Sequence, residues 1–438
     1  MNFVDEEYKL DTPAVVSHNA DEYEMVEIRS DNLNVTNDPV FRMSLKDTST
    51  YTNPHKGYLQ VTFSVVKAAD GSAYSAAENI TLKNSIGCLF SRAQLRLQNQ
   101  IVETVDEQHL CSHIKNIMLY SQDYQVSSAT NELYYKQTGT ALAADPAEFT
   151  TTPNEGFTSR NAAFNSGFKA AKDRTNNSTV VTCIIPLSHV FSFCGIDRVM
   201  TGNQLDVELT RSNASDHLFR DAGAADGKVA MSSISMWLPR IRPTPELDMN
   251  IKSMLSAGVT SDYVFPAYNG YLTTALPANA GSTNNRIATL SEKVLHAFVM
   301  LRKGGQAQTD SAHLTRDEIN ELSCRLNGRV YPSRRYDNLT TPEGKARGYL
   351  ELVRQASKSF SYADGIQLSL EDFSAQSVYG FDFTAQDENW SKCPSTVEVV
   401  ANLAASGGGA ARAFACVLVT EKQVQVSYMG GSPTINVV

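Results

Sequence analysis

Residues 180–211 read VVTCIIPLSHVFSFCGIDRVMTGNQLDVELTR and lie near the middle of a chain of 438 residues. They begin with a β-rich run, Val180–Ile185, which a proline closes. After a short aromatic segment and two turns, Leu205, Val207 and Leu209 alternate with polar residues. This period-two pattern is typical of a strand that is buried on one face only. The stretch therefore predicts two core strands joined by a structured crossing.

The chain before this stretch contains further strands and one short helix. Tyr58–Val65 alternates cleanly, and within 86–103 the residues Gln98–Gln100 are expected to form a turn. Gln108–Tyr120 has apolar residues at helical spacing instead, which predicts a short amphipathic helix. The segment Tyr124–Thr179 shows no strong period, and a long segment of this kind is usually a surface loop.

A cluster of prolines marks the expected boundary between two halves. The alternating residues that start at Ala230 lead into Pro239, Pro243 and Pro245. Proline has no backbone N–H to donate to a β-ladder, so regular pairing is expected to end there. Domain sizes of roughly 100 to 200 residues also favour at least two domains for a chain of this length.

The second half repeats the order of elements of the first. An apolar strand at 293–302 precedes an Asn-Gly hairpin turn in 322–331 and a short helix at 344–355. In that helix Leu350 and Val353 are expected on one side. The same order at an offset of about 230 residues suggests an internal duplication. Closing strands are expected at 377–383, 396–403 and 414–428, with loops at 277–285 and at Gly407–Gly409.

These patterns predict an all-β fold of two consecutive jelly-roll β-sandwiches (a double jelly roll) with short helices in the connections. Jelly rolls fit better than immunoglobulin-like domains, because each unit is long and has long loops between its strands. We expect an N-terminal arm at 1–25, a first jelly roll at 26–245 and a second at 246–438. The arm is acidic, with seven carboxylates against one Lys between Met1 and Glu24.

Composition argues against several functional classes. The net charge is -9, whereas a chain that neutralises nucleic-acid phosphates needs clustered Lys and Arg, so we expect no strong direct nucleic-acid binding. No apolar run reaches the roughly 18 to 20 residues of a membrane helix, so no membrane insertion is expected. The seven cysteines are scattered and odd in number, without a CxxC pair, which favours a reducing compartment over a disulfide framework.

Familiar catalytic motifs are absent from the sequence, which contains no HExxH, no phosphate-binding loop, no GxSxG and no Rossmann fingerprint. His109 and His113 stand four apart on the expected helix and could hold a metal. Without further ligands nearby, they are interpreted as surface or interface histidines. His189 has no identifiable nucleophile or orienting carboxylate around it, so a packed core or interface histidine is favoured over a catalytic base.

Two charged pairs have a functional and a structural interpretation. Glu371 and Asp372, with Asp364 upstream, could serve glycosidic acid–base chemistry, although a solvated turn is favoured. Arg334 and Arg335 could contact phosphate, although a salt bridge within or between subunits is favoured. The sequence therefore assigns no catalytic residue, no metal ligand and no cofactor, and predicts that the chain is not an enzyme.

Six short phrases spread over nearly the whole chain carry a family resemblance. They are SIGCLFS at 85–91, LRLQNQIVE at 95–103, IPLSHVF at 185–191, DVELTR at 206–211, SMWLP at 235–239 and VYGFDFT at 378–384. In combination with the order of elements, they resemble the double jelly-roll major capsid proteins of the lineage that includes polintons, adintoviruses and polinton-like viruses.

This resemblance implies a structural role in a DNA virus. Three copies, each with two upright jelly rolls, would form a homotrimer that is a pseudo-hexagonal capsomer, and capsomers would tile an icosahedral shell. The implied partners are neighbouring capsomers and penton or other minor capsid proteins, and the implied location is the virion. The alternatives are a paired-jelly-roll glycan-processing enzyme, and a non-virion scaffold or carbohydrate-binding sandwich protein.

Overall fold

The computed structural model is rich in strands, which form five sheets within the residues that it describes. Within the same residues, no helix is long and apolar enough to span a membrane. The described residues are 20–31, 38–46, 50–75, 78–121, 123–124, 127–136, 159–160, 180–201, 204–220, 223–257, 260–277, 281–303, 305, 307–309, 319–355, 366, 368–375, 378–384, 394–404, 411–429 and 432–437.

The first jelly roll contains twelve of the described strands. They are β1 Ala20–Arg29, β2 Val40–Leu45, β3 Tyr51–Thr52, β4 Tyr58–Lys67, β5 Ile80–Leu82, β6 Phe90–Leu97, β7 Gln100–Asp106, β8 Val181–Pro186, β9 Met200–Thr201, β10 Leu205–Arg211, β11 Leu218–Arg220 and β12 Gly227–Pro243. One sheet has the order β8-β4-β12-β3-β9, with β1 also paired to β12. A second sheet has the order β2-β10-β6-β7, and β11 pairs with β5.

The second jelly roll contains the remaining described strands. They are β13 Ser261–Leu272, β14 Ser282–Leu290, β15 Lys293–Lys303, β16 Ile319–Leu326, β17 Arg329–Tyr336, β18 Tyr379–Asp382, β19 Ser395–Leu403, β20 Arg412–Met429 and β21 Ser432–Val437. One sheet has the order β13-β20-β15-β18, with β21 also on β20, and the other has the order β14-β19-β16-β17. Among the described strands, no pairing joins β1–β12 to β13–β21.

Short helices occupy the connections between strands. They are η1 Pro54–Lys56, η2 Ile86–Leu89, α2 Gln108–Met118, η3 Ser128–Glu132, α5 Leu187–Val190, η5 Phe193–Gly195, α6 Ala214–His217, α7 Pro245–Ser256, α8 Pro342–Gln355 and α9 Leu370–Ala375. The predicted fold class, all-β with two jelly rolls and short connecting helices, is confirmed.

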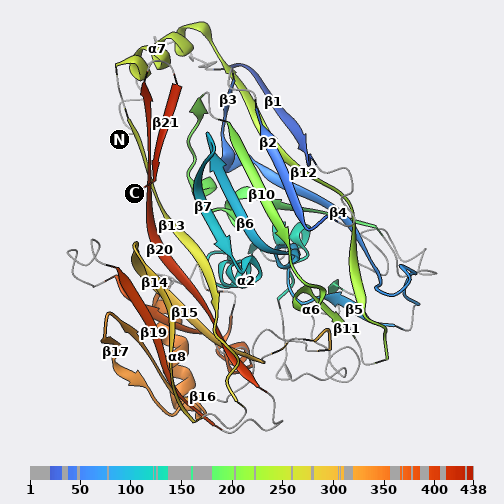
Figure 1. Ribbon diagram of the computed structural model, residues 1–438, viewed down its shortest axis with the longest axis vertical. Helices are drawn as coiled ribbons and strands as arrows, with labels where there is room; N and C mark the ends of the chain where they lie inside the picture. The colour runs from blue at the N-terminus through green and yellow to red at the C-terminus, as the bar shows by residue number, and fades with distance from the viewer. Residues whose placement is uncertain are drawn as a thin grey trace, which may run out of the picture.

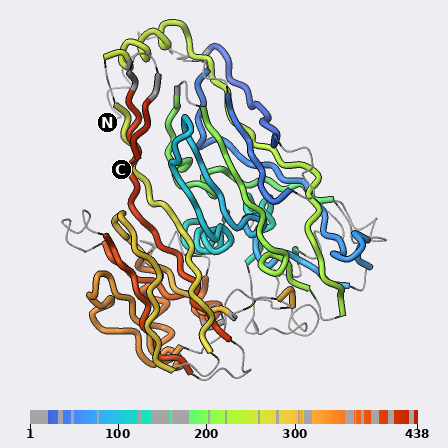
Figure 2. Tube along the Cα trace, in the orientation of Figure 1, coloured from blue at the N-terminus to red at the C-terminus, as the bar shows by residue number. Residues whose placement is uncertain are grey.

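The two rolls lie side by side, with α7 spanning one end of the molecule between β12 and β13 (Figure 1). β13 and β20 are long strands that pair with each other from Ser261 and Val426 to Leu272 and Ala415. They rise from the second roll and run along the first roll, and β21 extends this ribbon (Figure 2). The helix α2 lies against both rolls, since it contacts β6 of the first and β13 and β20 of the second.

The stretch 180–211 forms the predicted strands. β8 pairs with β4, whereas β10 lies between β2 and β6 in the other sheet, so the segment that joins them crosses from sheet to sheet through α5 and η5. Leu205, Val207 and Leu209 are at most 1% exposed, and the polar residues between them are half-buried. The alternating pattern therefore predicted both the strand and its buried face.

The order of elements predicted for the two halves is also present. β6 and β7 form a hairpin whose turn residues Gln98 and Asn99 have positive φ, as Asn327 and Gly328 do between β16 and β17. Positive φ at both central residues is the geometry of the tight turns that match strand twist. A helix follows each hairpin, α2 in the first roll and α8 in the second. In α8, however, Leu350 is 46% exposed, and the buried positions include Gly348 and Leu352.

The predicted end of pairing at the prolines was wrong at Pro239. β12 continues through Pro239, which pairs with Met25 of β1, and ends at Pro243. The β4 ladder stops at Trp237 and the β3 ladder begins at Arg240, so Pro239 falls between two ladders on that side of β12. Proline has no backbone N–H to donate. This is tolerated at Pro239 because β1 is the only described strand that pairs with β12 at this position.

Three other expectations need correction or lie outside the description. β1 begins at Ala20, so the expected arm at 1–25 includes the start of a paired strand. The expected loop at 277–285 includes the first residues of β14, which pair with β19. The strands β13 and β21 had no counterpart in the prediction. The hairpin loop at Gly407–Gly409 lies outside the described residues.

Candidate functional site: the seam between the two jelly rolls

The helix α2 is the element that both rolls cover. Every residue of α2 is buried, including polar residues such as Gln108 and Asn116, which are 0% exposed. It packs on η2, β6 and α5 of the first roll and on β13 and β20 of the second. The predicted amphipathic helix is present, and it is buried on all sides because elements of both rolls pack around it. We call the contact of β7, α2, α5 and η5 with β13 and β20 the seam.

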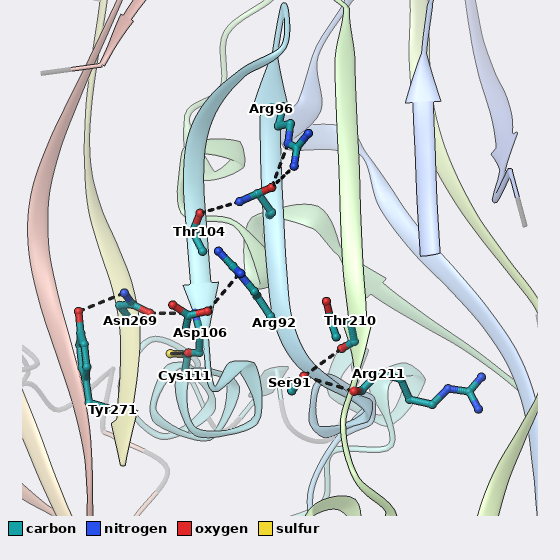
Figure 3. A network of polar contacts seen from close by, with 11 residues as sticks. Ser91, Arg92, Arg96, Thr104, Asp106, Cys111, Thr210, Arg211, Asn269 and Tyr271 are labelled. Atoms are coloured by element: carbon teal, nitrogen blue, oxygen red, sulfur yellow. Dashed lines mark hydrogen bonds and ion pairs between the residues drawn. The ribbon is translucent and has the colours of Figure 1, made fainter. Parts of the chain in front are cut away.

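The corner between β7 and α2 fits closely against β13. Glu107 has a left-handed backbone conformation, with φ 48°, and turns the chain from β7 into α2. The backbone N–H of Asp106 donates to Oδ1 of Asn269 at 2.8 Å, and Nδ2 of Asn269 donates to the Tyr271 hydroxyl at 3.2 Å (Figure 3). A Cβ at Gly270 would lie 2.6 Å from Cβ of Glu107, so only glycine fits there without rearrangement.

Aromatic and cationic side chains extend the seam along β13. The Phe193 ring of η5 packs against Tyr263 and Phe265, with centroids 5.4 and 5.6 Å apart. Nζ of Lys115 lies 5.0 Å from the centroid of the Tyr268 ring. Such contacts combine apolar burial with cation–π attraction. The seam is therefore a packed interior rather than a loose contact between domains.

Two buried groups of opposite charge, Glu103 and Lys115, tie the crossing segment to the seam through hydrogen bonds to its backbone. Glu103 of β7 accepts hydrogen bonds from the backbone N–H groups of Ser192 and Phe193 at 3.0 and 2.9 Å. Lys115 of α2 donates to the His189 carbonyl at 2.9 Å. Burial raises the pKa of Glu103, and the positive charge of Lys115 acts against this rise. Burial also lowers the pKa of Lys115, and the negative charge of Glu103 acts against this decrease. Removal of one partner would leave an uncompensated buried charge.

His189 lies in a chain of polar groups that the sequence did not reveal. Its Nε2 is 2.8 Å from the Ser112 hydroxyl and its Nδ1 is 2.7 Å from the Tyr120 hydroxyl. Tyr124, stacked on Tyr120, donates a hydrogen bond to the Glu132 carboxyl group. The expectation of no nearby nucleophile was therefore wrong, because Ser112 is adjacent although it lies 77 residues away in sequence.

This Ser–His contact is nevertheless closed to substrate. Ser112 and His189 are 1% and 0% exposed, and burial lowers the pKa of His189 to about 3, so the ring stays neutral. A general base needs access to the substrate proton that it removes. The interpretation of His189 as a packed core histidine is confirmed.

His109 and His113 are buried on α2, at 1% and 6% exposure, so of the two expected positions, surface or interface, the surface position was wrong. Nδ1 of His113 is 2.9 Å from Nδ2 of Asn84, and Nδ1 of His109 is 3.4 Å from a Glu107 oxygen. In the part of the chain that the structure describes, no three potential metal ligands gather. The two histidines thus lack the additional ligands that a structural metal site requires.

The two arginines after cis-Pro332 form ion pairs within the chain, as favoured. Arg335 lies 2.9 Å from Glu321, and Arg334 lies 3.5 Å from Asp337. Arg347 of α8 donates to the Arg334 carbonyl at 2.7 Å. These side chains hold β17 to its neighbours in the second roll.

The acidic pair lies at the start of a helix rather than in a turn. Glu371 and Asp372 belong to the first turn of α9, and Asp372 exchanges hydrogen bonds with Ser369, whose hydroxyl caps the helix. Lys136 also contacts Asp372, at 2.7 Å. This is the capping-box arrangement, so Asp372 has a structural role. Asp364 lies outside the described residues.

The six described cysteines are free and buried, as expected for small apolar core residues. Burial raises the pKa of Cys88 to about 12 and that of Cys416 well above its usual value, so these thiols stay protonated. Cys393 lies outside the described residues. The reducing compartment stays a prediction.

Comparison with known structures identifies the fold. A chain of the Sputnik virophage structure matches with a TM-score of 0.63 at 10% identity, covering 98% of this chain and 92% of that chain. The mavirus major capsid protein matches with a TM-score of 0.56 at 13% identity, covering 99% and 93%. A chain of the PBCV-1 virus capsid matches with a TM-score of 0.50 at 11% identity, covering 94% and 96%.

No protein-family model and no curated protein matches this chain in sequence. The structural matches therefore carry the comparison, and at this low identity they show a common fold. The chain has the double jelly-roll fold, the fold of these viral capsid proteins.

Proposed function

We propose that this chain is a structural major capsid protein, located in the virion of a DNA virus. The observation that carries the proposal is the match to the Sputnik virophage chain, which extends over 98% of this chain and 92% of the other. A match of this extent leaves little of either chain outside the common double jelly roll. The mavirus match, to a protein described as a major capsid protein, supports the same function.

The duplicated architecture supports a homotrimeric capsomer. Each chain supplies two similar rolls, so three copies would place six rolls around one axis and give a pseudo-hexagonal block. Closed symmetric assembly from one chain is the usual solution for homo-oligomers. The partners would be neighbouring capsomers and penton or other minor capsid proteins. The resemblance of the short phrases at 85–91 and 185–191 favours the lineage of polintons, adintoviruses and polinton-like viruses.

The proposed units are an arm at 1–25, of which Ala20–Met25 contributes to β1, and rolls at 26–245 and 246–438. The separation of strand pairing on either side of α7 supports this division. The seam would make the two rolls behave as one block during assembly, because α2 is buried between them.

A non-enzymatic role is part of the proposal. The Ser112–His189 contact is buried, and Asp372 is engaged in the cap of α9, so Glu371 is left without a second carboxyl group for acid–base chemistry. The glycan-processing alternative requires two carboxyl groups that converge on a scissile bond. We therefore expect the purified protein to leave glycans intact.

Size-exclusion chromatography with light scattering tests the proposal on the full chain. We expect a particle mass of three times the 48.0 kDa chain, or a larger multiple of that trimer. The same preparation should release no sugar from glycoprotein or polysaccharide substrates. A strictly monomeric protein that cleaves glycans would refute the capsid proposal.

A further inference from the structure

The sheet β14-β19-β16-β17 of the second roll ends in two edge strands that differ in their chemistry (Figure 1). At one edge, β17 carries features that discourage pairing with another chain. Pro332 has no backbone N–H to donate, and the carbonyl groups of Arg334 and Arg335 already accept hydrogen bonds from Arg347 of α8 at 2.7 and 3.0 Å. Arg329 adds a third exposed positive charge on this strand. Proline, charge and a covering element are common protections of a sheet edge.

β14, at the opposite edge of the same sheet, lacks these protections. Its nine residues, STNNRIATL, contain no proline and one charged residue, Arg286. Among the described residues, β14 pairs with β19 alone, and its backbone makes no other hydrogen bond. In an antiparallel ladder, every second residue of an edge strand points its N–H and C=O away from the neighbouring strand. β14 therefore presents unused backbone donors and acceptors along one side, which is a template for an added strand.

A bulge limits the regular part of this edge to residues 282–286. The register with β19 shifts between Arg286 and Ala288, and a bulge bends the strand that carries it. Within the regular part, Ser282, Asn284 and Arg286 are exposed, whereas the two residues between them are half-buried. An added strand is therefore expected to pair with 282–286 and to stop at the bulge.

These five residues are able to pair with the same five residues of a second copy. With Asn284 opposite itself in an antiparallel pair, Ser282 faces Arg286 and Thr283 faces Asn285. Exposed residues then lie opposite exposed residues, and no two like charges face each other across the strands. Among the described residues, Nδ2 of Asn285 is buried without a hydrogen-bond partner. This register places the Thr283 hydroxyl of the second copy, which has acceptor capacity, opposite that amide.

Such a contact has two-fold symmetry, because the same strand contributes both halves. Three copies around one axis are joined head to tail by two different surfaces, so a strand that pairs with itself cannot belong to that ring. We propose that β14 is a contact between neighbouring capsomers, in which residues 282–286 of one copy pair antiparallel with 282–286 of a copy in the next trimer. The inference rests on the proposed trimeric capsid protein, and it names the strand by which one capsomer recognises another.

Cysteine crosslinking of the full-length protein tests this register. When concentrated trimers are mildly oxidised, N284C should join two chains by a disulfide, because Cβ atoms directly opposite each other lie about 5 Å apart, within reach after a small adjustment. S282C is the matched control on the same strand and face. Its copies would lie roughly 13 Å apart along the paired strands, so it should stay reduced. Non-reducing electrophoresis and mass spectrometry of the joined peptides provide the readout, and the six described native cysteines are buried.

Charge variants test the same contact without a covalent bond. N284K and N284E should each weaken the association of trimers about threefold or more in sedimentation velocity, because like charges then face each other across the two-fold axis. An equal mixture of the two variants should recover the association, because opposite charges then meet. S333K, at an exposed position of β17, is the matched control and should associate as the wild type does.

The proposal is overturned if N284C forms no disulfide or crosslinks no better than S282C. It is also overturned if the mixture of N284K and N284E associates no better than either variant alone. All variants should keep the mass of the trimer, because the ring uses other surfaces. A wild-type chain that stays monomeric would refute the trimeric capsomer instead, and the comparison of N284C with S282C would still decide whether β14 pairs with itself.

Discussion

Gly270 lies against the corner between β7 and α2, where the backbones of the two rolls approach each other. An added Cβ would lie 2.6 Å from the Glu107 Cβ and 2.9 Å from the Asp106 carbonyl oxygen. We expect G270A to lower the free energy of unfolding by about 1–3 kcal/mol, because a closely packed site must shift to admit the methyl group. Denaturant unfolding measures this change. G281A is the matched control, since a Cβ there meets nothing within 4 Å, and an equal loss in both variants would contradict the account.

The buried carboxyl group of Glu132 is expected to make the stability of the folded protein depend on pH. Burial raises the pKa of Glu132 to about 8, so the folded protein holds this carboxyl group protonated at neutral pH. A raised folded-state pKa gives stability that is complete below the unfolded value of 4.5 and is lost as pH rises through about 8.

E132Q imitates the protonated carboxyl group and cannot titrate. From pH 5 to pH 9, we expect the free energy of unfolding of the variant to gain up to about 4 kcal/mol relative to wild type, the equivalent of about three pKa units. Urea unfolding of both proteins at the two pH values measures the difference. Parallel pH profiles would show that Glu132 is ionised in the folded protein.

At the level of elements, the hairpin turn between β16 and β17 depends on a glycine at its second central position. Gly328 has φ 84°, where L residues are strained, and a Cβ there meets nothing within 4 Å. G328A should therefore cost about 1–2 kcal/mol from backbone strain alone. G195A has equal space without a left-handed φ and is the matched control in thermal unfolding. Similar midpoints for the two variants would contradict this explanation.

Elements with a clear local pattern could be predicted from sequence. The alternation of Leu205, Val207 and Leu209 gave the strand and its buried face, and Asn327-Gly328 gave the hairpin turn. These signals depend on neighbours in the chain and on one buried side, so they need no knowledge of the partner sheet.

The seam could not be predicted in the same way. α2 has an amphipathic pattern, and its polar residues are buried only because elements of both rolls pack around it. Ser112 and His189 meet across 77 residues, and Asn269 meets Asp106 across 163, so no spacing in the sequence indicates either contact. Pro239 was misjudged for a related reason, because the tolerance of proline depends on which ladders flank it.

For the whole molecule, the seam joins the two rolls through α2, so that the chain is built as one block. Three such blocks would supply six similar rolls, which is the number that a pseudo-hexagonal capsomer contains. The match over 98% of the chain to the Sputnik virophage structure fits this architecture. Assembly, rather than chemistry at a cleft, is the function that this arrangement favours.

Negative-stain electron microscopy of the purified full-length protein tests this claim most directly. Class averages should show pseudo-hexagonal particles built from three copies of the chain, alone or joined in shells. Single elongated two-lobed particles at every protein concentration would contradict it.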